Sequence, residues 1–204
     1  MNLPALIADD STPIAAIAEA LEASSHTARL DAVLALNRGQ QRALYRKAAQ
    51  SPPVTLEDFL PHGSAPGASI RHHGRNTLPL PRALQFFEKR CCMPQDGNSR
   101  VFGYNHWPPM TRLIGPGYFV AEATKDNAAW EERGAIVVDY YQVPDGPVVA
   151  GWPEIVPNTV GLQKFIFHRT RDFMRRVSRD VTIGAAFRND KPLDHYFVLV
   201  RTAA

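Results

Sequence analysis

Apolar residues follow a helical spacing in the first 50 residues of the chain and alternate after residue 100. Ile14, Ile17 and Leu21 recur every three or four residues behind a Ser-Thr-Pro segment, which is typical of a helix start. Two more short helices are expected over residues 27–36 and 40–49. Runs that alternate or are rich in sheet-forming residues, and so predict β-strands, cover residues 101–104, 118–124, 135–143, 181–187 and 195–201.

A stretch rich in proline and glycine separates the two patterns. Residues 51–82 contain six prolines and three glycines, and this stretch is expected to be a loop. A loop of this length in a compact chain commonly serves as a lid, a binding loop or a linker. The chain is therefore expected to comprise a helical N-terminal segment (1–50), a connecting loop region (51–98) and a core of antiparallel sheet plus helix (99–204).

One further long helix is predicted over residues 162–178. Its buried stripe would comprise Leu162, Phe165, Ile166, Phe173 and Val177. Strands and helices do not alternate regularly along the chain, which argues against a doubly wound parallel sheet. The expected fold class is α+β: an N-terminal helical segment packed on a mostly antiparallel sheet with one long covering helix.

Charge and cysteine usage restrict the environment and the partners. The net charge is +3, and the basic residues concentrate in residues 164–179. Cys91 and Cys92 are adjacent, which disfavours a disulfide between them, and a buried pair in a reducing, cytoplasmic compartment is expected. The first ten residues lack a basic region, so no signal peptide is expected, and no apolar run reaches the roughly 20 residues that cross a bilayer.

One segment of the expected loop concentrates groups that can bind anions or move protons. It comprises Arg71, His72, His73, Arg75 and Asn76, with a glycine among them. Guanidinium groups bind carboxylate or phosphate in a bidentate manner, and imidazoles transfer protons near neutral pH. The alternative is an exposed polar loop tip. Adjacent side chains on an extended chain point to opposite sides, so no metal site is predicted here.

A second candidate segment follows the first predicted strand. Tyr104, His106 and Trp107 leave a strand end together, where pockets often form, and His106 is a candidate acid or base. Asp139 and Tyr140 lie in the most apolar strand; a carboxylate there is a catalytic candidate or the partner of an arginine. The alternative for each is a structural role.

Neither a nucleotide-binding loop nor a zinc-protease, hydrolase or CxxC motif is present in the sequence. The favoured function is binding of a small acidic or anionic ligand without a cofactor; whether the chain is also an enzyme stays open. The expected pocket would be lined by Tyr104, Trp107, Tyr118, Tyr140 and Phe167, with the segment 71–76 as its lid.

Two alternatives involve macromolecular partners, and the oligomeric state is left open. The N-terminal helices could dock a protein partner, which predicts an exposed apolar stripe on Ile14, Ile17 and Leu21. The basic helix could contact nucleic acid through Arg171, Arg175 and Arg179, but the small net charge makes this alternative less favoured.

Overall fold

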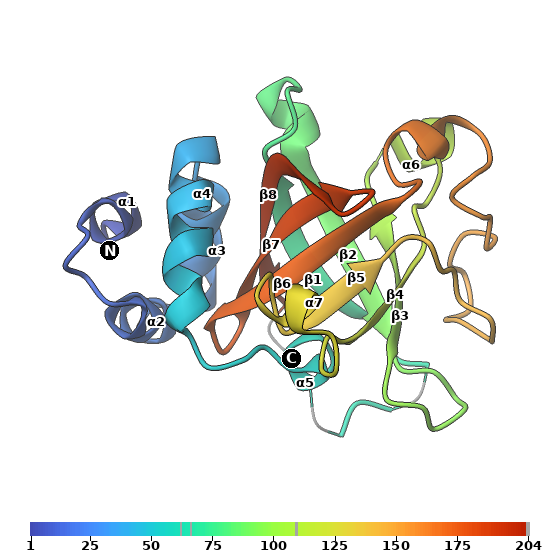
Figure 1. Cartoon of the computed structure of the whole chain (residues 1–204), viewed down its shortest axis with the longest axis horizontal. Helices are drawn as coiled ribbons and strands as arrows, with labels where there is room; N and C mark the ends of the chain where they lie inside the picture. The colour runs from blue at the N-terminus through green and yellow to red at the C-terminus, as the bar shows by residue number, and fades with distance from the viewer. Residues whose placement is uncertain (62, 66, 109, 203–204) are drawn as a thin grey trace.

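The computed structural model describes residues 1–61, 63–65, 67–108 and 110–202, and these form a closed antiparallel β-barrel with helices outside it (Figure 1). Each strand pairs with its neighbours in sequence, and β8 pairs with β1 to close the barrel. The strands are β1 (Ile70–Asn76), β2 (Phe86–Cys92), β3 (Val101–His106), β4 (Phe119–Ala123), β5 (Ile136–Asp139), β6 (Thr170–Ser178), β7 (Val181–Arg188) and β8 (Lys191–Arg201).

The helices are short and most of them precede the barrel in sequence. They are α1 (Leu3–Ala8), α2 (Ile14–Glu22), α3 (His26–Leu34), α4 (Arg38–Lys47), α5 (Leu56–Phe59), α6 (Met110–Ile114) and α7 (Ala128–Glu131), with 3-10 turns η1 (Ala48–Gln50), η2 (Arg82–Gln85) and η3 (Leu162–Phe165). The predicted N-terminal helices are thereby confirmed. Asn37 and Gln40 form a reciprocal capping box at the start of α4, which satisfies two backbone N–H groups there.

The expected α+β fold with one long covering helix is wrong. Residues 170–178 form β6, which pairs with β5 and β7, and only residues 162–165 turn into a short 3-10 segment. Asp172 and Met174 alternate with Phe173 in β6, and all three side chains are buried. Because this strand is covered on both faces, its apolar residues are not restricted to alternate positions, and their spacing imitates a helical stripe.

The expected loop over residues 51–82 is also wrong in its second half. Residues 70–76 form β1, hydrogen-bonded to β2 on one side and to β8 on the other. The segment 71–76 is therefore part of the barrel wall and cannot act as a lid. His62 and Pro66, which belong to the same predicted loop, lie outside the described residues.

The four N-terminal helices pack on the outer face of the last three strands, as Figure 1 shows beside β7 and β8. Ile14, Ile17 and Leu21 are buried in this contact, so the predicted exposed stripe is wrong. The strand residues that face the helices are Val177, Val181, Ile183, Ala185, Val198 and Val200. The N-terminal helices and the outer face of the barrel thus share one apolar core, separate from the barrel interior.

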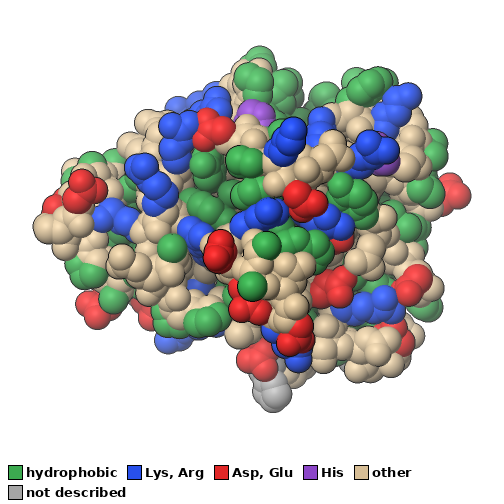
Figure 2. All heavy atoms as spheres, in the orientation of Figure 1, with side chains coloured by type: hydrophobic (Ala, Val, Ile, Leu, Met, Phe, Trp, Pro, Cys, Tyr) green, Lys and Arg blue, Asp and Glu red, His purple; other side chains and the backbone are tan. Residues whose placement is uncertain are grey.

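The predicted basic helix face does not exist, because its arginines lie on β6 and in the turn after it. Arg171 pairs with Asp139, and Arg175 donates to the carbonyls of Tyr45 and Glu132. Arg179 pairs with Glu22. Figure 2 shows basic and acidic side chains interspersed over the face that it presents, without a continuous basic surface there.

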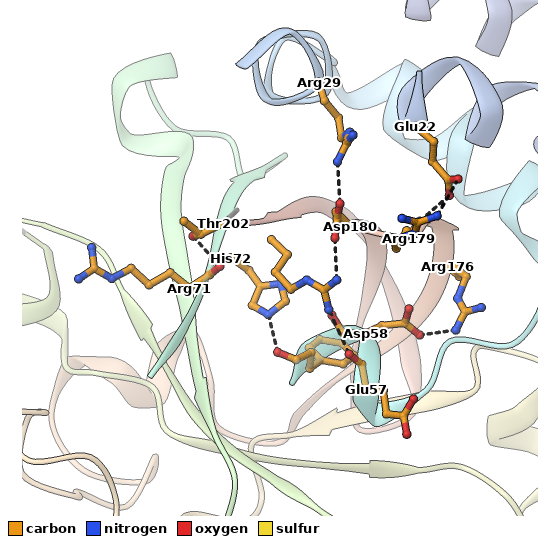
Figure 3. A network of polar contacts seen from close by, with 12 residues as sticks. Glu22, Arg29, Glu57, Asp58, Arg71, His72, Arg176, Arg179, Asp180 and Thr202 are labelled. Atoms are coloured by element: carbon orange, nitrogen blue, oxygen red, sulfur yellow. Dashed lines mark hydrogen bonds and ion pairs between the residues drawn. The ribbon is translucent and has the colours of Figure 1, made fainter. Parts of the chain in front are cut away.

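One end of the barrel is closed by the segment that precedes β1. Phe59 and Leu60, at the end of α5, are buried among the interior side chains. Asp58 accepts hydrogen bonds from the Thr55 N–H and from the Arg176 guanidinium, at 2.7 and 2.6 Å, and so fixes α5 to the barrel (Figure 3). The connections β1–β2, β3–β4, β5–β6 and β7–β8 lie at the opposite end, because successive strands are antiparallel.

Cys91 and Cys92 are both buried and free, as predicted. Among the described residues, no helix has the length and apolar character needed to cross a bilayer. In the same part of the chain, no cluster of three or more His, Cys, Asp or Glu side chains could hold a metal ion.

Candidate functional site

The open end of the barrel contains a cavity of about 280 Å³. Most of its wall is apolar and includes Leu78, Phe87, Phe165, Ile166, Phe167 and Phe197. A smaller polar group includes Asn76, Lys89, Asn105, Tyr140, Asp172 and Arg188. A concave, mostly apolar space with a few converging polar groups is the usual form of a small-molecule site.

Lys89 reaches the barrel interior because it lies at an inward position of β2. Phe87 and Cys91, two residues away on either side, also belong to the interior, whereas Glu88 and Arg90 lie on the other face of the strand and pair with each other. The Lys89 side chain is 1% exposed. A lysine buried to this degree requires partners inside the protein.

Three side chains supply these partners: Asn105 in β3, Asp172 in β6 and Tyr140 directly after β5. The Lys89 Nζ donates to the Tyr140 hydroxyl at 2.5 Å and to the Asn105 Oδ1 at 3.1 Å. The Asp172 Oδ2 lies 3.5 Å from the same nitrogen. These four residues, Lys89, Asn105, Tyr140 and Asp172, are called the interior tetrad below.

The tetrad is held by the connections at the open end. The Asn105 amide donates to the Gly117 carbonyl at 2.9 Å and to the Tyr140 hydroxyl at 3.2 Å, which fixes the side chain with its oxygen toward Lys89. The Tyr140 ring stacks on Phe167, with centroids 5.1 Å apart and planes at 23°. The position of the tetrad therefore depends on the β3–β4 and β5–β6 connections as well as on the strands.

Burial shifts the pKa values of Lys89, Tyr140 and Asp172 in the directions that favour their uncharged forms. The pKa of Lys89 is lowered mainly by desolvation, and the negative charge of Asp172 opposes this shift. Desolvation likewise raises the pKa of Asp172, against the effect of Lys89. The pKa of Tyr140 is raised well above its usual value by desolvation and by Asp172, so the hydroxyl keeps its proton.

Aromatic rings surround the ammonium group of Lys89. The Nζ of Lys89 lies 4.7 Å from the ring centroid of Phe119 and 4.9 Å from that of Phe197. The Tyr140 and Phe87 rings lie at 5.1 and 5.9 Å. Cation–π attraction offsets part of the desolvation cost when the amine is protonated.

Two further cavity residues carry polar atoms without a partner. The indole N–H of Trp107 and the Nδ1 of His195 are buried and have no hydrogen-bond partner among the described residues. Such groups are rare in folded proteins because each costs about 1–3 kcal/mol. Desolvation lowers the pKa of His195, so its ring is neutral at pH 7 and one ring nitrogen accepts a hydrogen bond.

Three of the ten residues predicted for the site line the cavity: Asn76, Trp107 and Tyr140. The cavity also includes Phe167 from the expected pocket lining, whereas Tyr104 and Tyr118 pack outside the barrel wall against Trp152. The segments 71–76 and 104–107 thus meet at the cavity through one residue each.

Three of the remaining predicted residues have other partners, and a fourth, Arg71, is exposed. The buried Nε2 of His72 lies 3.0 Å from the Phe59 carbonyl oxygen, at the closed end of the barrel. The Arg75 guanidinium donates to the carbonyls of Leu34 and Ala35 at the end of α3, at 3.1 and 2.8 Å. Asp139 accepts from Arg171 at 3.0 Å, which matches the structural alternative for this carboxylate. The Arg71 side chain is exposed (Figure 3).

His73 and His106 also lie on the outer face of the wall. His73 is partly exposed, 3.8 Å from Glu88, and the His106 ring packs against Tyr104. Desolvation and the nearby Arg90 lower the pKa of His106. Their distance from the cavity follows from strand alternation, because Gly74 and Asn105 occupy the adjacent inward positions.

Sequence reasoning missed Lys89, Asp172 and His195, and it quoted Asn105 without giving it a role. The signal for Lys89 was its place between two apolar residues at alternate positions, Phe87 and Cys91. Asp172 alternates in the same way with Met174. Neither signal could be used, because residues 86–92 were not recognised as a strand and residues 170–178 were expected to be helical.

The fold and the cavity define a class: an up-and-down antiparallel barrel that is closed at one end and hollow at the other, consistent with a ligand-binding barrel. Comparison with protein-family models, with curated proteins and with solved structures gives no match to this chain.

Proposed function

We propose that this protein binds a small organic molecule inside the barrel, with an apolar body against the aromatic wall and an oxygen-bearing group directed at Lys89. The observation that carries the proposal is the interior tetrad, which places a buried amine at the polar centre of an otherwise apolar cavity. Eight-stranded barrels have room for side chains or for one small ligand, which fits a cavity of about 280 Å³.

The tetrad is poorly explained by stability alone. The desolvation cost of a buried ion pair is comparable to its attraction, and apolar residues of similar size commonly serve a barrel core equally well. Perturbed titratable groups in a cavity are more typical of functional sites. Trp107 and His195 add a donor and an acceptor whose hydrogen bonds a ligand could satisfy.

The anionic group foreseen from the sequence would be recognised here by Lys89, because neither Arg71 nor Arg75 lines the cavity. The ligand's oxygen would share the amine with Asp172, so an uncharged carbonyl or hydroxyl oxygen also fits this position.

Binding can be tested with the environment-sensitive dye 1-anilinonaphthalene-8-sulfonate and its displacement by naphthalene-2-carboxylate and 2-naphthalenemethanol. We expect one site per chain. Ala186→Phe should abolish binding because Ala186 lines the cavity and the added ring fills it. Lys89→Met should weaken binding of the naphthalene ligands about 10–100-fold, the usual effect of losing a hydrogen bond to a charged group.

Lys164→Met is the matched control, because it removes the same charge from an exposed position next to Phe165. Its affinity should stay within about twofold of the wild type. Equal binding by the wild type and Ala186→Phe would show that the dye binds elsewhere and would contradict the proposed function. Circular dichroism of each variant checks that the barrel is intact.

A further inference from the structure

We propose that Lys89 captures an aldehyde or ketone ligand covalently, as a Schiff base within the barrel. The inference rests on the proposed function and adds the chemical class of the ligand. It stands on geometry: a primary amine borders a cavity and lies within 3.5 Å of a hydroxyl, a carboxylate and an amide oxygen.

An amine must be uncharged to attack a carbonyl carbon, and the surroundings of Lys89 favour that form. The side chain is 1% exposed, and this desolvation penalises the ammonium ion more than the cation–π contacts with the surrounding rings compensate. Asp172 is placed to take the proton, since burial makes this carboxylate a stronger base than usual. The same pair therefore exists as an ion pair at rest and as neutral amine plus neutral acid when it reacts.

The reaction balances without any oxidant or reductant. The Nζ lone pair forms a C–N bond to the carbonyl carbon, the C=O π electrons move to oxygen, and a proton passes from nitrogen to that oxygen to give a carbinolamine. The hydroxyl group then takes a proton from Asp172, the C–O bond breaks, and water leaves. The nitrogen lone pair completes the C=N bond.

The neighbours of Lys89 suit these proton transfers. Tyr140 keeps its proton and lies 2.5 Å from Nζ, so its hydroxyl can donate to the ligand oxygen as charge develops there. The Asn105 Oδ1, at 3.1 Å, accepts a hydrogen bond from the amine and orients its lone pair. Asn105 is thereby a positioning residue, held in turn by the Gly117 carbonyl.

A neutral carbonyl fits the charges of the cavity better than a carboxylate. A carboxylate at Lys89 would approach Asp172, which lies 3.5 Å from the amine. Arg188 is the other Lys or Arg among the described lining residues, and its guanidinium donates to the carbonyls of Phe165 and Ile166. The aromatic wall favours an aryl or conjugated aldehyde as the ligand.

Reductive trapping tests the inference with a defined probe, 2-naphthaldehyde. The intact protein is incubated at pH 7 with the aldehyde and sodium cyanoborohydride, which reduces the imine to a stable amine. Mass spectrometry should show one naphthylmethyl group per chain, and peptide mapping should place it on Lys89. The other four lysines, Lys47, Lys125, Lys164 and Lys191, serve as internal controls, and each should react at least about tenfold more slowly because protonated amines are poor nucleophiles.

Three variants separate capture by Lys89 from background labelling. Lys89→Met should lose the adduct, and Lys164→Met should keep it. The double variant Lys89→Met/Asp172→Asn should also lose it, and it leaves no unpaired buried carboxylate that could unfold the chain. Tyr140→Phe should slow trapping about 10–100-fold, the usual effect of losing a hydrogen bond to a charged group, and this loss should exceed its loss of affinity for 2-naphthalenemethanol.

The outcomes distinguish the inference from the function on which it rests. If 2-naphthalenemethanol displaces the dye but the aldehyde labels only exposed lysines, covalent capture is overturned and the proposed function stands. If neither compound enters the barrel, both fail. Labelling of Lys89 at the rate of an exposed lysine would also overturn the inference, since the cavity would then contribute nothing to the reaction.

Discussion

At the scale of single residues, Lys89 and His72 are basic side chains that are almost fully buried inside the barrel, for different reasons. Lys89 lines the cavity beside Asp172, whereas His72 lies near the closed end with its ring nitrogen on the Phe59 carbonyl. A carbonyl oxygen can accept a hydrogen bond from a neutral imidazole, but it does not compensate a buried positive charge fully. His72 is therefore a structural group whose protonation opposes folding.

Stability should fall in acid because of His72. Desolvation lowers its pKa from 6.5 to about 4 in the folded protein. Above pH 6.5 the ring is neutral in both the folded and the unfolded state, so His72 makes its full contribution to the free energy of unfolding. As the pH falls from 6.5 toward 4, only the unfolded state binds a proton, so the free energy of unfolding drops by about 1.4 kcal/mol per pH unit.

Urea denaturation at pH 7.5 and pH 4.5 measures this contribution. Between these pH values, protonation of His72 should lower the free energy of unfolding of the wild type by about 2–3 kcal/mol. This part of the decrease should be absent in His72→Gln. His73→Gln is the control, because His73 is the adjacent, outward-facing and partly exposed histidine of the same strand. Parallel pH profiles for the wild type and His72→Gln would contradict the assignment.

At the scale of elements, five strands were predictable because their alternation or β-branched composition is strong. The ranges 101–104, 118–124, 135–143, 181–187 and 195–201 each overlap an observed strand. β1 and β2 were not predicted because both strands have polar side chains at inward as well as outward positions. In β2 these side chains form the charged run Glu88–Arg90. β6 was hidden by apolar residues on both faces, a pattern that periodicity cannot separate from a helix.

Gly103 in β3 is needed because the barrel wall passes close to an interior ring. A Cβ atom at this position would lie 2.3 Å from the Phe119 ring and 2.7 Å from the Arg90 carbonyl oxygen. The ring would have to move inside a packed core, and the carbonyl belongs to the paired strand β2. Gly103→Ala should therefore lower the free energy of unfolding by about 1–3 kcal/mol, as other overpacking substitutions do.

Gly39→Ala, the same substitution at another site, should raise the free energy of unfolding. Gly39 lies in α4, and its added Cβ would meet only the Asn37 Oδ1 at an ordinary 3.5 Å. Alanine should stabilise the protein by about 0.4–1 kcal/mol, since it restricts the unfolded chain and favours the helix. Chemical denaturation of both variants tests the pair, and a stabilising Gly103→Ala would contradict the observed packing.

At the scale of the whole molecule, closure of the sheet decides both the fold and the site. With five strands and a covering helix, an open sheet is the natural expectation; with eight consecutive strands, β1 can pair with β8 and the interior becomes a cavity. The aromatic part of the site was predicted from different elements: Trp107 at a strand end, Tyr140 within a strand and Phe167 on the expected covering helix. Lys89 and Asp172 were not, because they meet only when β2 and β6 face each other across the barrel.

The N-terminal helices and the barrel should unfold as one unit, because α2 and its neighbours cover the apolar outer face of β6–β8. Ile17 is fully buried in this contact. Ile17→Ala should lower the free energy of unfolding by about 2–4 kcal/mol, the usual cost of such a truncation. Leu113→Ala, which truncates a side chain that is 65% exposed, should change it by less than about 0.5 kcal/mol.

Two spectroscopic probes of denaturation can test whether the helices and the barrel unfold together. All three tryptophans lie beyond residue 100, so their fluorescence reports the barrel, whereas far-ultraviolet circular dichroism also reports the helices. In Ile17→Ala, both signals should shift to the same lower denaturant concentration, because coincident transitions are the signature of one cooperative unit. A tryptophan transition that stays at the wild-type midpoint while the helical signal is lost earlier would mean that the barrel stands without its helices. The cavity would then be a property of residues 51–202 alone.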